Sequence, residues 1–240
     1  MDLKELEQGV DPKTHWYYQS KKLPLLRFVK SVAQQQNSKI TLIDVGSGSG
    51  FFMYELMDAI PDKIEKVWLV DIGYSDAEIA ETKNKIIEKT KILPPQIQNG
   101  VYVMMDVLEH LPDDKAMLLD IKKSCSGNNY FFITVPAFQS LWSGHDVYLE
   151  HFRRYRIATL RNVLSEAGFN TNITYYIYNS IFPLVWLVRK ISNKTYKPKT
   201  SLKPIHPMLN AGLKTFHTIE NGLGKWNKLF GVTCVAEGKI

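Results

Sequence analysis

A run of glycine and serine residues after a short apolar segment has the composition of a ligand-binding turn. The run Asp44-Val-Gly-Ser-Gly-Ser-Gly50 overlaps the end of the apolar segment Ile40–Val45. Glycine permits positive φ angles and lets a ligand approach the backbone without a Cβ in the way. The run therefore predicts a turn between a strand and a helix that binds a ligand through its backbone.

The spacing of these glycines excludes the common phosphate-binding loops. A dinucleotide fingerprint, Gly-x-Gly-x-x-Gly, fails because counting from Gly46 places Phe51 in the third glycine position, and no Gly-Lys-Ser/Thr follows. The carboxylate of Asp44 would repel a pyrophosphate but suits a cationic amine. A second acid, Asp71, ends the next apolar run, where a carboxylate can accept hydrogen bonds from ribose hydroxyls.

This combination of loop and acid resembles the first motif and the strand-two acid of class I S-adenosylmethionine-dependent methyltransferases. The resemblance implies a Rossmann-like α/β fold, with a mostly parallel sheet of seven strands and helices on both faces. It also implies S-adenosylmethionine as the cofactor. The cofactor contacts that it assigns are Asp44, Gly46, Ser47, Gly48, Gly50, Asp71 and Ile72.

A second polar segment, residues 106–110, follows another apolar run and is similar to the post-strand-four segment of small-molecule methyltransferases. The similarity implies that Asp106 and Val107 contact the cofactor. Some O-methyltransferases, in ubiquinone biosynthesis and small-RNA 2′-O-methylation, hold a divalent metal with Glu-x-x-Glu-His. Because Asp106 is shorter than the first glutamate of that pattern, we expect no metal. A site formed by Asp106, Glu109 and His110 is the alternative.

A third segment concentrates aromatic, imidazole, carboxylate and guanidinium groups between residues 141 and 155. It contains Leu141-Trp-Ser-Gly-His-Asp146 and His151-Phe-Arg-Arg-Tyr155. With His15-Trp-Tyr-Tyr18, it resembles a bacterial methyltransferase subgroup associated with cell-surface glycan and lipid pathways. The resemblance is good over about residues 15–170 and loose in the C-terminal part.

The third segment also supplies the predicted catalytic and acceptor-binding residues. His145 is the predicted general base, oriented by Asp146 or Asp106, because a neutral imidazole can take a proton from an acceptor hydroxyl near pH 7. The alternative is a structural hydrogen bond that holds the loop. The arginines suit a phosphate or carboxylate, or pair with an internal acid instead. The predicted acceptor contacts are Trp142, His151, Arg153 and Arg154.

Alternating apolar runs and helical segments must position these residues. Such alternation implies a parallel sheet covered on both faces, with ligands bound outside the carboxyl ends of its strands. Residues 72–100 are fewer than the family pattern requires, so any strand at 91–93 is a stub and the adenine contacts stay unassigned. The expected strands are 40–45, 67–71, 101–105, 130–135 and 172–177, and the expected helices are 51–60, 76–89, 113–123 and 157–168.

We expect a single methyltransferase domain with added segments at both ends. The N-terminal segment is predicted to be helical, and residues 181–191 and 210–229 are further helices. Residues 230–236 are predicted to be a last strand placed as in an edge hairpin. The predicted parts are a helical cap at 1–38, a cofactor-binding core at 39–177, an insert or cover at 178–215, and a final helix and strand at 216–240.

The bulk composition constrains the partners and the compartment. The net charge of +6 permits an anionic partner. Residues 189–203 hold six cations and no acid, which predicts either a solvated loop or a surface that binds an anionic partner. Two cysteines without metal spacing, and an N-terminus without an apolar core, predict a cytoplasmic protein. No stretch approaches the roughly 20 apolar residues that span a bilayer, which leaves a peripheral membrane contact open.

Three functions are compatible with these features. The first is methyl transfer to a small molecule, at an oxygen of a glycan- or lipid-linked acceptor. The second is RNA or protein methylation, but the Asn/Asp-Pro-Pro-aromatic signature of many amino-group methyltransferases is replaced by Val135-Pro-Ala-Phe138. The third, a non-catalytic cofactor-binding protein, is disfavoured by the polar density of residues 142–155. We therefore predict the first function, with nucleic acid not expected as a partner.

Overall fold

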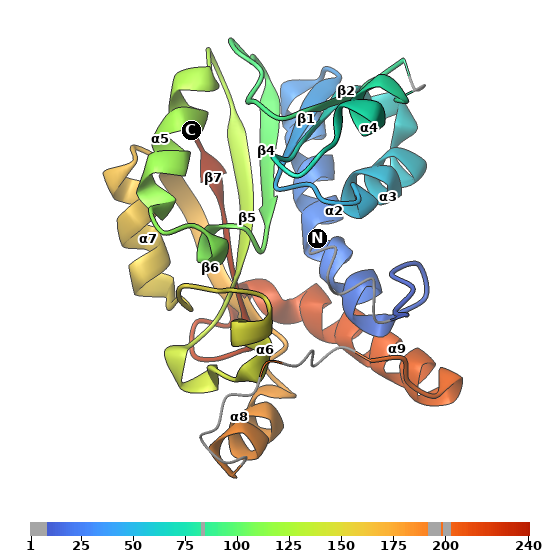
Figure 1. Ribbon diagram of the computed structural model, residues 1–240, viewed down its shortest axis with the longest axis vertical. Helices are drawn as coiled ribbons and strands as arrows, with labels where there is room; N and C mark the ends of the chain where they lie inside the picture. The colour runs from blue at the N-terminus through green and yellow to red at the C-terminus, as the bar shows by residue number, and fades with distance from the viewer. Residues whose placement is uncertain (1–8, 83–84, 192–197, 199–202) are drawn as a thin grey trace.

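A sheet of seven strands forms the centre of the protein (Figure 1). The computed structural model describes residues 9–82, 85–191, 198 and 203–240. The strand order is β3-β2-β1-β4-β5-β7-β6, and β7 alone runs in the direction opposite to the other six strands. The strands are β1 (Ile40–Val45), β2 (Ile64–Val70), β3 (Ile87–Thr90), β4 (Gly100–Met105), β5 (Tyr130–Pro136), β6 (Asn170–Ile177) and β7 (Thr233–Lys239). The predicted Rossmann-like fold is confirmed.

Helices cover both faces of this sheet. The helices are α2 (Trp16–Gln36), α3 (Phe51–Ala59), α4 (Asp76–Ala80), α5 (Asp114–Ser124), α6 (Gly144–Tyr148), α7 (Ile157–Glu166), α8 (Phe182–Ile191) and α9 (Pro207–Leu223). Short 3-10 turns lie at Pro61–Lys63, Leu108–His110, Gln139–Leu141 and Gly224–Trp226. In the described parts of the chain, no helix is long and apolar enough to cross a membrane.

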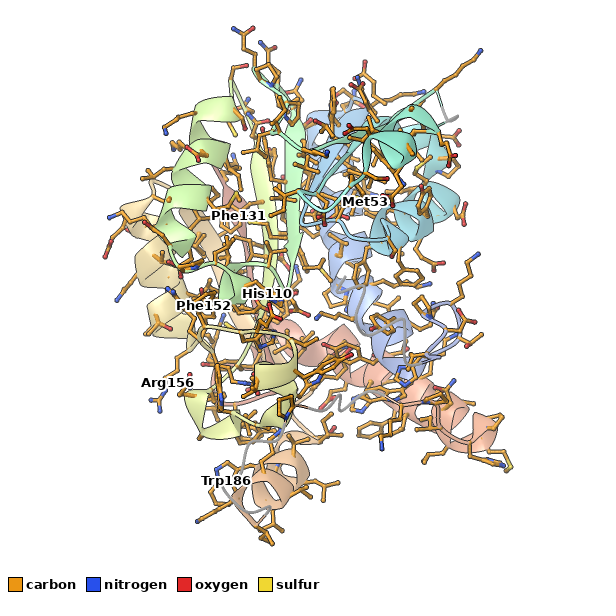
Figure 2. All side chains as sticks on the ribbon, viewed as in Figure 1. Met53, His110, Phe131, Phe152, Arg156 and Trp186 are labelled. Carbon is orange, nitrogen blue, oxygen red and sulfur yellow. The ribbon has the colours of Figure 1, made fainter. Side chains whose placement is uncertain are left out.

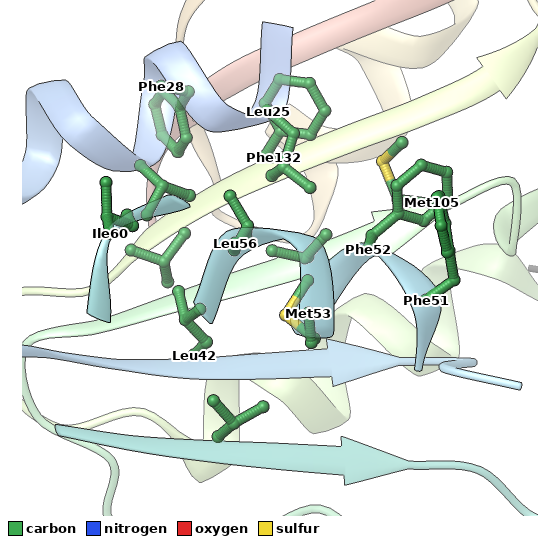
Figure 3. Close-up of a cluster of buried hydrophobic side chains, with 14 of the residues drawn as sticks. Leu25, Phe28, Leu42, Phe51, Phe52, Met53, Leu56, Ile60, Met105 and Phe132 are labelled. Carbon is green, nitrogen blue, oxygen red and sulfur yellow. The ribbon is translucent and has the colours of Figure 1, made fainter. Parts of the chain in front are cut away.

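Successive residues of a strand pack into hydrophobic cores on opposite faces of the sheet, because side chains alternate between the two faces of a strand. Leu42 packs in the core shared with α2 and α3, whereas its neighbour Ile43 packs in the core shared with α5 and α7. Figure 3 shows the first core, where Leu25 and Phe28 of α2 meet Phe132 of β5. Burial on both faces explains why the parallel strands read as continuous apolar runs.

The segment after β2 differs from the predicted helix over 76–89. Helix α4 ends at Ala80, and β3 begins at Ile87, before the stub predicted at 91–93. Lysine and glutamate favour a helix locally, but β3 pairs in parallel with β2, with Val67 opposite Ile87, and Ile87 is buried. The open edge of β2 and the burial of Ile87 outweigh the local propensity.

The last strand also differs from its predicted place at an edge. Strand β7 lies between β5 and β6, with Ala236 opposite Ile133 on one side and Val235 opposite Tyr175 on the other. Cys234, Val235 and Ala236 are fully buried. Pairing on both sides encloses these residues, so β7 lies inside the sheet and β6 is the edge strand instead.

Helix α2 crosses to the carboxyl ends of the strands and packs against α9 (Figure 1). It contains Pro24, which has no N–H to donate to the carbonyl of Ser20. That carbonyl accepts a hydrogen bond from the Asn221 side chain of α9 at 3.2 Å instead. The packing of α9 thereby stabilises the first turns of α2, whose side chains face the functional site.

Candidate functional site

The glycine run forms the turn between β1 and α3, as predicted. Gly46, Gly48 and Gly50 have φ angles of 70°, 52° and 72°, in the left-handed region that favours glycine. A Cβ on Gly46 would lie 2.7 Å from Cγ2 of Val107, and one on Gly50 would lie 2.8 Å from Cδ1 of Leu69. The turn therefore presents bare backbone toward the carboxyl ends of the strands.

Side chains from the end of β2 hold this turn in shape. Oδ2 of Asp71 accepts a hydrogen bond from the amide of Gly48 at 2.8 Å, and Oδ1 accepts one from the amide of Gly73 at 2.8 Å. The hydroxyl of Tyr74 lies 2.8 Å from Oγ of Ser47 and donates to the carbonyl of Gly48 at 2.8 Å. A carboxylate has about four acceptor positions, so Asp71 retains capacity for ribose hydroxyls.

The carboxyl group of Asp44 is enclosed at the base of the turn. Burial raises the pKa of Asp44 to about 7, and the nearby charge of Asp71 adds to the rise. A bound cation restores the ionised form, because an opposite charge within about 4–6 Å favours it. Asp44 therefore fits the amino group of S-adenosylmethionine, and Ile72, which follows Asp71, has 88% of its surface exposed.

An ion pair between a buried lysine and a half-buried aspartate lies at the end of β4. Nζ of Lys21, on α2, contacts the carboxylate of Asp106 and donates to the hydroxyl of Tyr17 at 2.9 Å. Oγ1 of Thr134 donates to the other oxygen of Asp106 at 2.9 Å. Removal from water opposes ionisation of Asp106, but the charge and hydrogen bond of Lys21 outweigh it and hold its pKa below the ordinary value. Asp106 is thus an ionised and oriented carboxylate.

A pocket opens beside this ion pair, at the carboxyl ends of the strands. His110, one of its lining residues, lies at the end of the sheet that faces α6 and α8 (Figure 2). Its walls combine aromatic and aliphatic side chains with histidines and arginines. They come from α2 (Trp16, Tyr17, Tyr18, Lys21), from α3 (Phe52), from the strand ends and the turn after β4 (Met105, Asp106, Glu109, His110, Pro136, Val232, Thr233), from α6 and its flank (His145, Leu149, His151, Arg154) and from α8 and the residue before it (Ile181, Val185, Arg189).

Comparison with known protein families assigns the chain. Residues 15–173, well over half of its length, match the family model described as a methyltransferase domain. The chain belongs to this methyltransferase family. No curated protein matches it.

Solved structures share the fold of this methyltransferase. It resembles an S-adenosylmethionine-dependent methyltransferase from Archaeoglobus fulgidus at 15% identity, with a TM-score of 0.56 over 99% of this chain and 98% of that one. It resembles another from Mesorhizobium loti at 12% identity, with a TM-score of 0.55 over 96% and 100%. A putative sarcosine dimethylglycine methyltransferase from Galdieria sulphuraria shows 14% identity, a TM-score of 0.52 and coverage of 89% and 85%. At such identities the likeness shows the fold alone.

Family and fold together confirm the enzyme class that the glycine turn predicts. The protein is an S-adenosylmethionine-dependent methyltransferase. Its residues fit the cofactor, because the turn at Gly46 admits no side chain and the buried Asp44 requires a cation to ionise readily. Membership of the narrower glycan- and lipid-related subgroup stays a prediction.

The two predicted catalytic residues, His145 and Asp146, lie in different surroundings in this methyltransferase. His145, at the start of α6, lines the pocket. The carboxylate of Asp146 is fully buried and accepts from the Ser143 amide at 2.8 Å, Nε of Arg154 at 2.6 Å and Nδ1 of His151 at 3.1 Å. These bonds direct Asp146 toward His151, so the predicted orientation of His145 by Asp146 is replaced by orientation of His151.

The predicted acceptor contacts are only partly brought together. His151 and Arg154 line the pocket. Arg153 donates to the carbonyls of Leu111 and Pro112 at 3.1 and 2.5 Å and lies 3.3 Å from Asp114, so it fixes the loop before α5. This is the predicted pairing with an internal acid. Trp142 follows the turn Gln139–Leu141 and lies outside the pocket lining.

The alternative metal ligands are arranged differently from the sequence pattern. Asp106 is paired with Lys21, while Glu109 and His110 approach His151 instead. His151 follows α6 and is 41 positions beyond His110 in the sequence, which explains why a motif of adjacent residues does not include it.

Lys21 is the main site residue that the sequence reading missed. It is only 2% exposed and lies on the buried face of α2, three residues after Tyr18 and four before Leu25. A lysine in the apolar stripe of an amphipathic helix was the available signal, because a buried lysine is almost always paired. Arg189 of α8 is a second pocket residue that was not predicted from the sequence, because no local motif includes it.

Proposed function

We propose that this methyltransferase methylates an oxygen of a small acceptor that carries both an apolar part and an anionic group, as a lipid-linked or glycan-linked phosphate does. The observation that supports the proposal is the mixed lining of the pocket. Aromatic and aliphatic walls from Trp16, Tyr17, Ile181 and Val185 surround it, and guanidinium groups stand at one side.

The guanidinium groups carry an excess positive charge. Arg154 is paired with Asp146, and Nη1 of Arg189 lies 4.0 Å from the same carboxylate and donates to the carbonyl of Leu141. Burial, and then the charge of Arg154, lower the pKa of Arg189 to about 10, so it remains charged at neutral pH. Two guanidinium groups share one carboxylate here, which favours a phosphate or carboxylate on the acceptor.

The main contribution of the protein to this reaction is to position the acceptor relative to the methyl group. S-adenosylmethionine, when bound, supplies the electrophilic methyl group. The residues of the pocket hold the acceptor oxygen in line with that group and exclude water, which accounts for much of the rate in such reactions. His145 takes the hydroxyl proton as the oxygen is methylated.

The acceptor class is tested by a cofactor-product release assay with a panel of acceptors. Polyprenyl-phosphate-linked saccharides, nucleotide sugars, a free neutral saccharide, RNA oligonucleotides and a protein mixture are compared at equal concentration. We expect turnover with the polyprenyl-linked substrates and a loss of at least tenfold with the neutral saccharide. Methylation of RNA or protein alone would overturn the proposal.

We also propose that α8 and α9 rest on an anionic membrane surface. Leu184, Leu187, Val188 and Ile191 of α8 recur at three- and four-residue spacing and are exposed. Inverted packing of this kind, with apolar residues in solvent, marks an interaction surface rather than a solvated helix.

Helix α9 shows the same inversion. Its buried residues His217 and Asn221 are polar, whereas Leu209, Phe216 and Ile219 are exposed. Both helices lie at the end of the molecule that holds the pocket (Figure 1).

Charge favours a lipid surface as the partner of these helices. Lys190 of α8 and Lys214 of α9 are exposed beside the apolar residues. Ile181, Val185 and Arg189, just before or on α8, line the pocket, so the pocket is continuous with the proposed lipid-facing surface. Lys194, Lys197 and Lys199, which belong to the same cationic stretch, lie outside the described residues, as do residues 192–197 and 199–202 of the predicted cover at 178–215.

A further inference from the structure

Among the described residues, a buried carboxyl group of the pocket lacks a hydrogen-bond partner. Glu109, in the turn after β4, is 0% exposed, and neither of its carboxyl oxygens has a hydrogen-bond partner within the described part of the chain. A buried polar group without a partner is costly and rare in native proteins, so this one requires an explanation.

Two imidazoles stand next to this carboxyl group. One ligand atom from each of Glu109, His110 and His151 lies within 4.8 Å of the other two. The two imidazole rings meet edge to face, with their centroids 4.6 Å apart. The segments are tied together because the amide of Phe152 donates to the backbone carbonyl of Glu109 at 2.7 Å. Ligand atoms on one ion lie about 3–3.5 Å apart, so small side-chain rotations suffice to gather these three.

The tautomer of His151 is set by its other nitrogen. Nδ1 lies 3.1 Å from Oδ1 of Asp146, whose carboxylate Arg154 also holds. Nε of Arg154 lies 2.6 Å from Oδ1 of Asp146 and the Ser143 amide donates to Oδ2, so Asp146 accepts hydrogen bonds on both oxygens. In a neutral imidazole placed this way, Nδ1 of His151 donates to Asp146, and Nε2 is the nitrogen that offers a lone pair. A carboxylate that orients a histidine in this way is the usual support of a metal-binding imidazole.

We propose that Glu109, His110 and His151 bind a divalent transition-metal ion at the wall of the pocket. Two imidazoles and one carboxylate suit Zn²⁺, Mn²⁺ or Fe²⁺ better than Mg²⁺ or Ca²⁺, which prefer oxygen ligands throughout. The ion satisfies both oxygens of Glu109 and explains why an acid is buried there. Asp106 is not a ligand, because Lys21 already neutralises it.

All three ligands line the pocket, so the ion leaves coordination positions open toward the acceptor. This role rests on the proposed function. A hydroxyl bound to such an ion loses its proton more readily. The proton passes to His145, the oxygen forms its bond to the methyl carbon, and the sulfur–methyl bond breaks with its electron pair left on sulfur.

Binding is tested with the metal alone, without turnover. The full chain is treated with a chelator and dialysed, and Zn²⁺ and Mn²⁺ are then titrated by calorimetry, with Mg²⁺ as a comparison. We expect one Zn²⁺ per chain. Glu109→Gln and His151→Gln should each weaken the affinity at least tenfold. Asp106→Asn and His206→Ala, the latter an exposed histidine outside the pocket, should leave the affinity within threefold of wild type.

Thermal unfolding with and without Zn²⁺ keeps the test independent of misfolding. We expect Zn²⁺ to raise the melting temperature of wild type but not of Glu109→Gln, which should itself melt no lower than the metal-free wild type because it removes a buried acid. Absence of saturable binding, or equal affinity in a folded Glu109→Gln variant, would overturn the site. Binding without methylation of any lipid-linked acceptor would leave the site standing and reject only the proposed function.

Discussion

Among single residues, the enclosed carboxyl group of Asp44 makes cofactor binding depend on pH. Because burial raises its pKa to about 7, the group is largely protonated in the unliganded protein below that pH. The cationic cofactor binds the ionised form, so binding releases a proton. The affinity for S-adenosylmethionine should rise by up to about tenfold per pH unit from pH 5.5 toward 7 and then level off.

Calorimetry at pH 5.5, 6.5 and 7.5 checks this prediction, with Asp44→Asn as the matched variant. Asn cannot ionise, so its weaker binding should be flat across this range. The stability of the unliganded protein should change in the opposite direction. A folded pKa above the unfolded value favours the folded state at low pH, and this contribution disappears as the pH rises from about 4 through 7. Equal pH dependence in both proteins would contradict the assignment.

His145 offers a second prediction about a single residue. Its side chain lines the pocket, and a general base is typically worth about 10²–10⁴-fold in rate. His145→Ala should therefore lower turnover by that factor and change the cofactor affinity less than threefold. Single-turnover kinetics and calorimetry separate the two effects, with His206→Ala as the control. Near-full turnover in His145→Ala would show that this imidazole only holds the loop.

Among the elements, the contact between α2 and α9 supports the wall of the pocket. Pro24 leaves the carbonyl of Ser20 without a helical donor, and the Asn221 side chain satisfies it. The backbone of Asn221 also contacts α2, since its backbone carbonyl accepts a hydrogen bond from the Arg27 guanidinium. The strand ends therefore do not position Trp16, Tyr17 and Lys21 by themselves: α9 contributes from a distant part of the sequence.

Asn221→Ala should lower the free energy of unfolding by about 1–3 kcal/mol, because it leaves a buried carbonyl without a partner. Denaturant unfolding measures the change. Thr218→Ala, at an exposed position of the same helix, serves as the control and should change the stability by less than about 0.5 kcal/mol. An Asn221→Ala variant as stable as this control would show that water satisfies the carbonyl equally well.

For the whole molecule, the net charge of +6 and the inverted faces of α8 and α9 predict binding to anionic vesicles. Flotation with vesicles that contain about one third anionic lipid should recover the protein at low salt and lose it at high salt, since surface charge is screened. Replacing Leu187 and Val188 with Ser should abolish binding. Leu119→Ser, an exposed leucine on α5, is the control.

Two outcomes of the flotation experiment would contradict the membrane proposal. One is no recovery of the wild-type protein with anionic vesicles at low salt. The other is equal recovery of wild type and the Leu187 and Val188 double variant. In either case the apolar faces must serve another partner.

The sequence by itself determined the strands of the core, the glycine turn and the cofactor. These features are local: Asp44 and the three glycines are adjacent in the chain, and the apolar runs of β1, β4 and β5 are as long as the strands they form. A turn that admits no Cβ needs glycine whatever surrounds it. Local chemistry of this kind is readable from a single sequence.

Only the tertiary structure decided the partners of the polar residues and the places of β3 and β7. Lys21 neutralises Asp106 across 85 positions, and His151 approaches Glu109 across 42. Strand β7 enters between β5 and β6 because two neighbours are needed to bury it, which its own composition does not specify. Which buried groups meet depends on helices and strands that pack from distant parts of the chain, and no spacing along the sequence encodes that meeting.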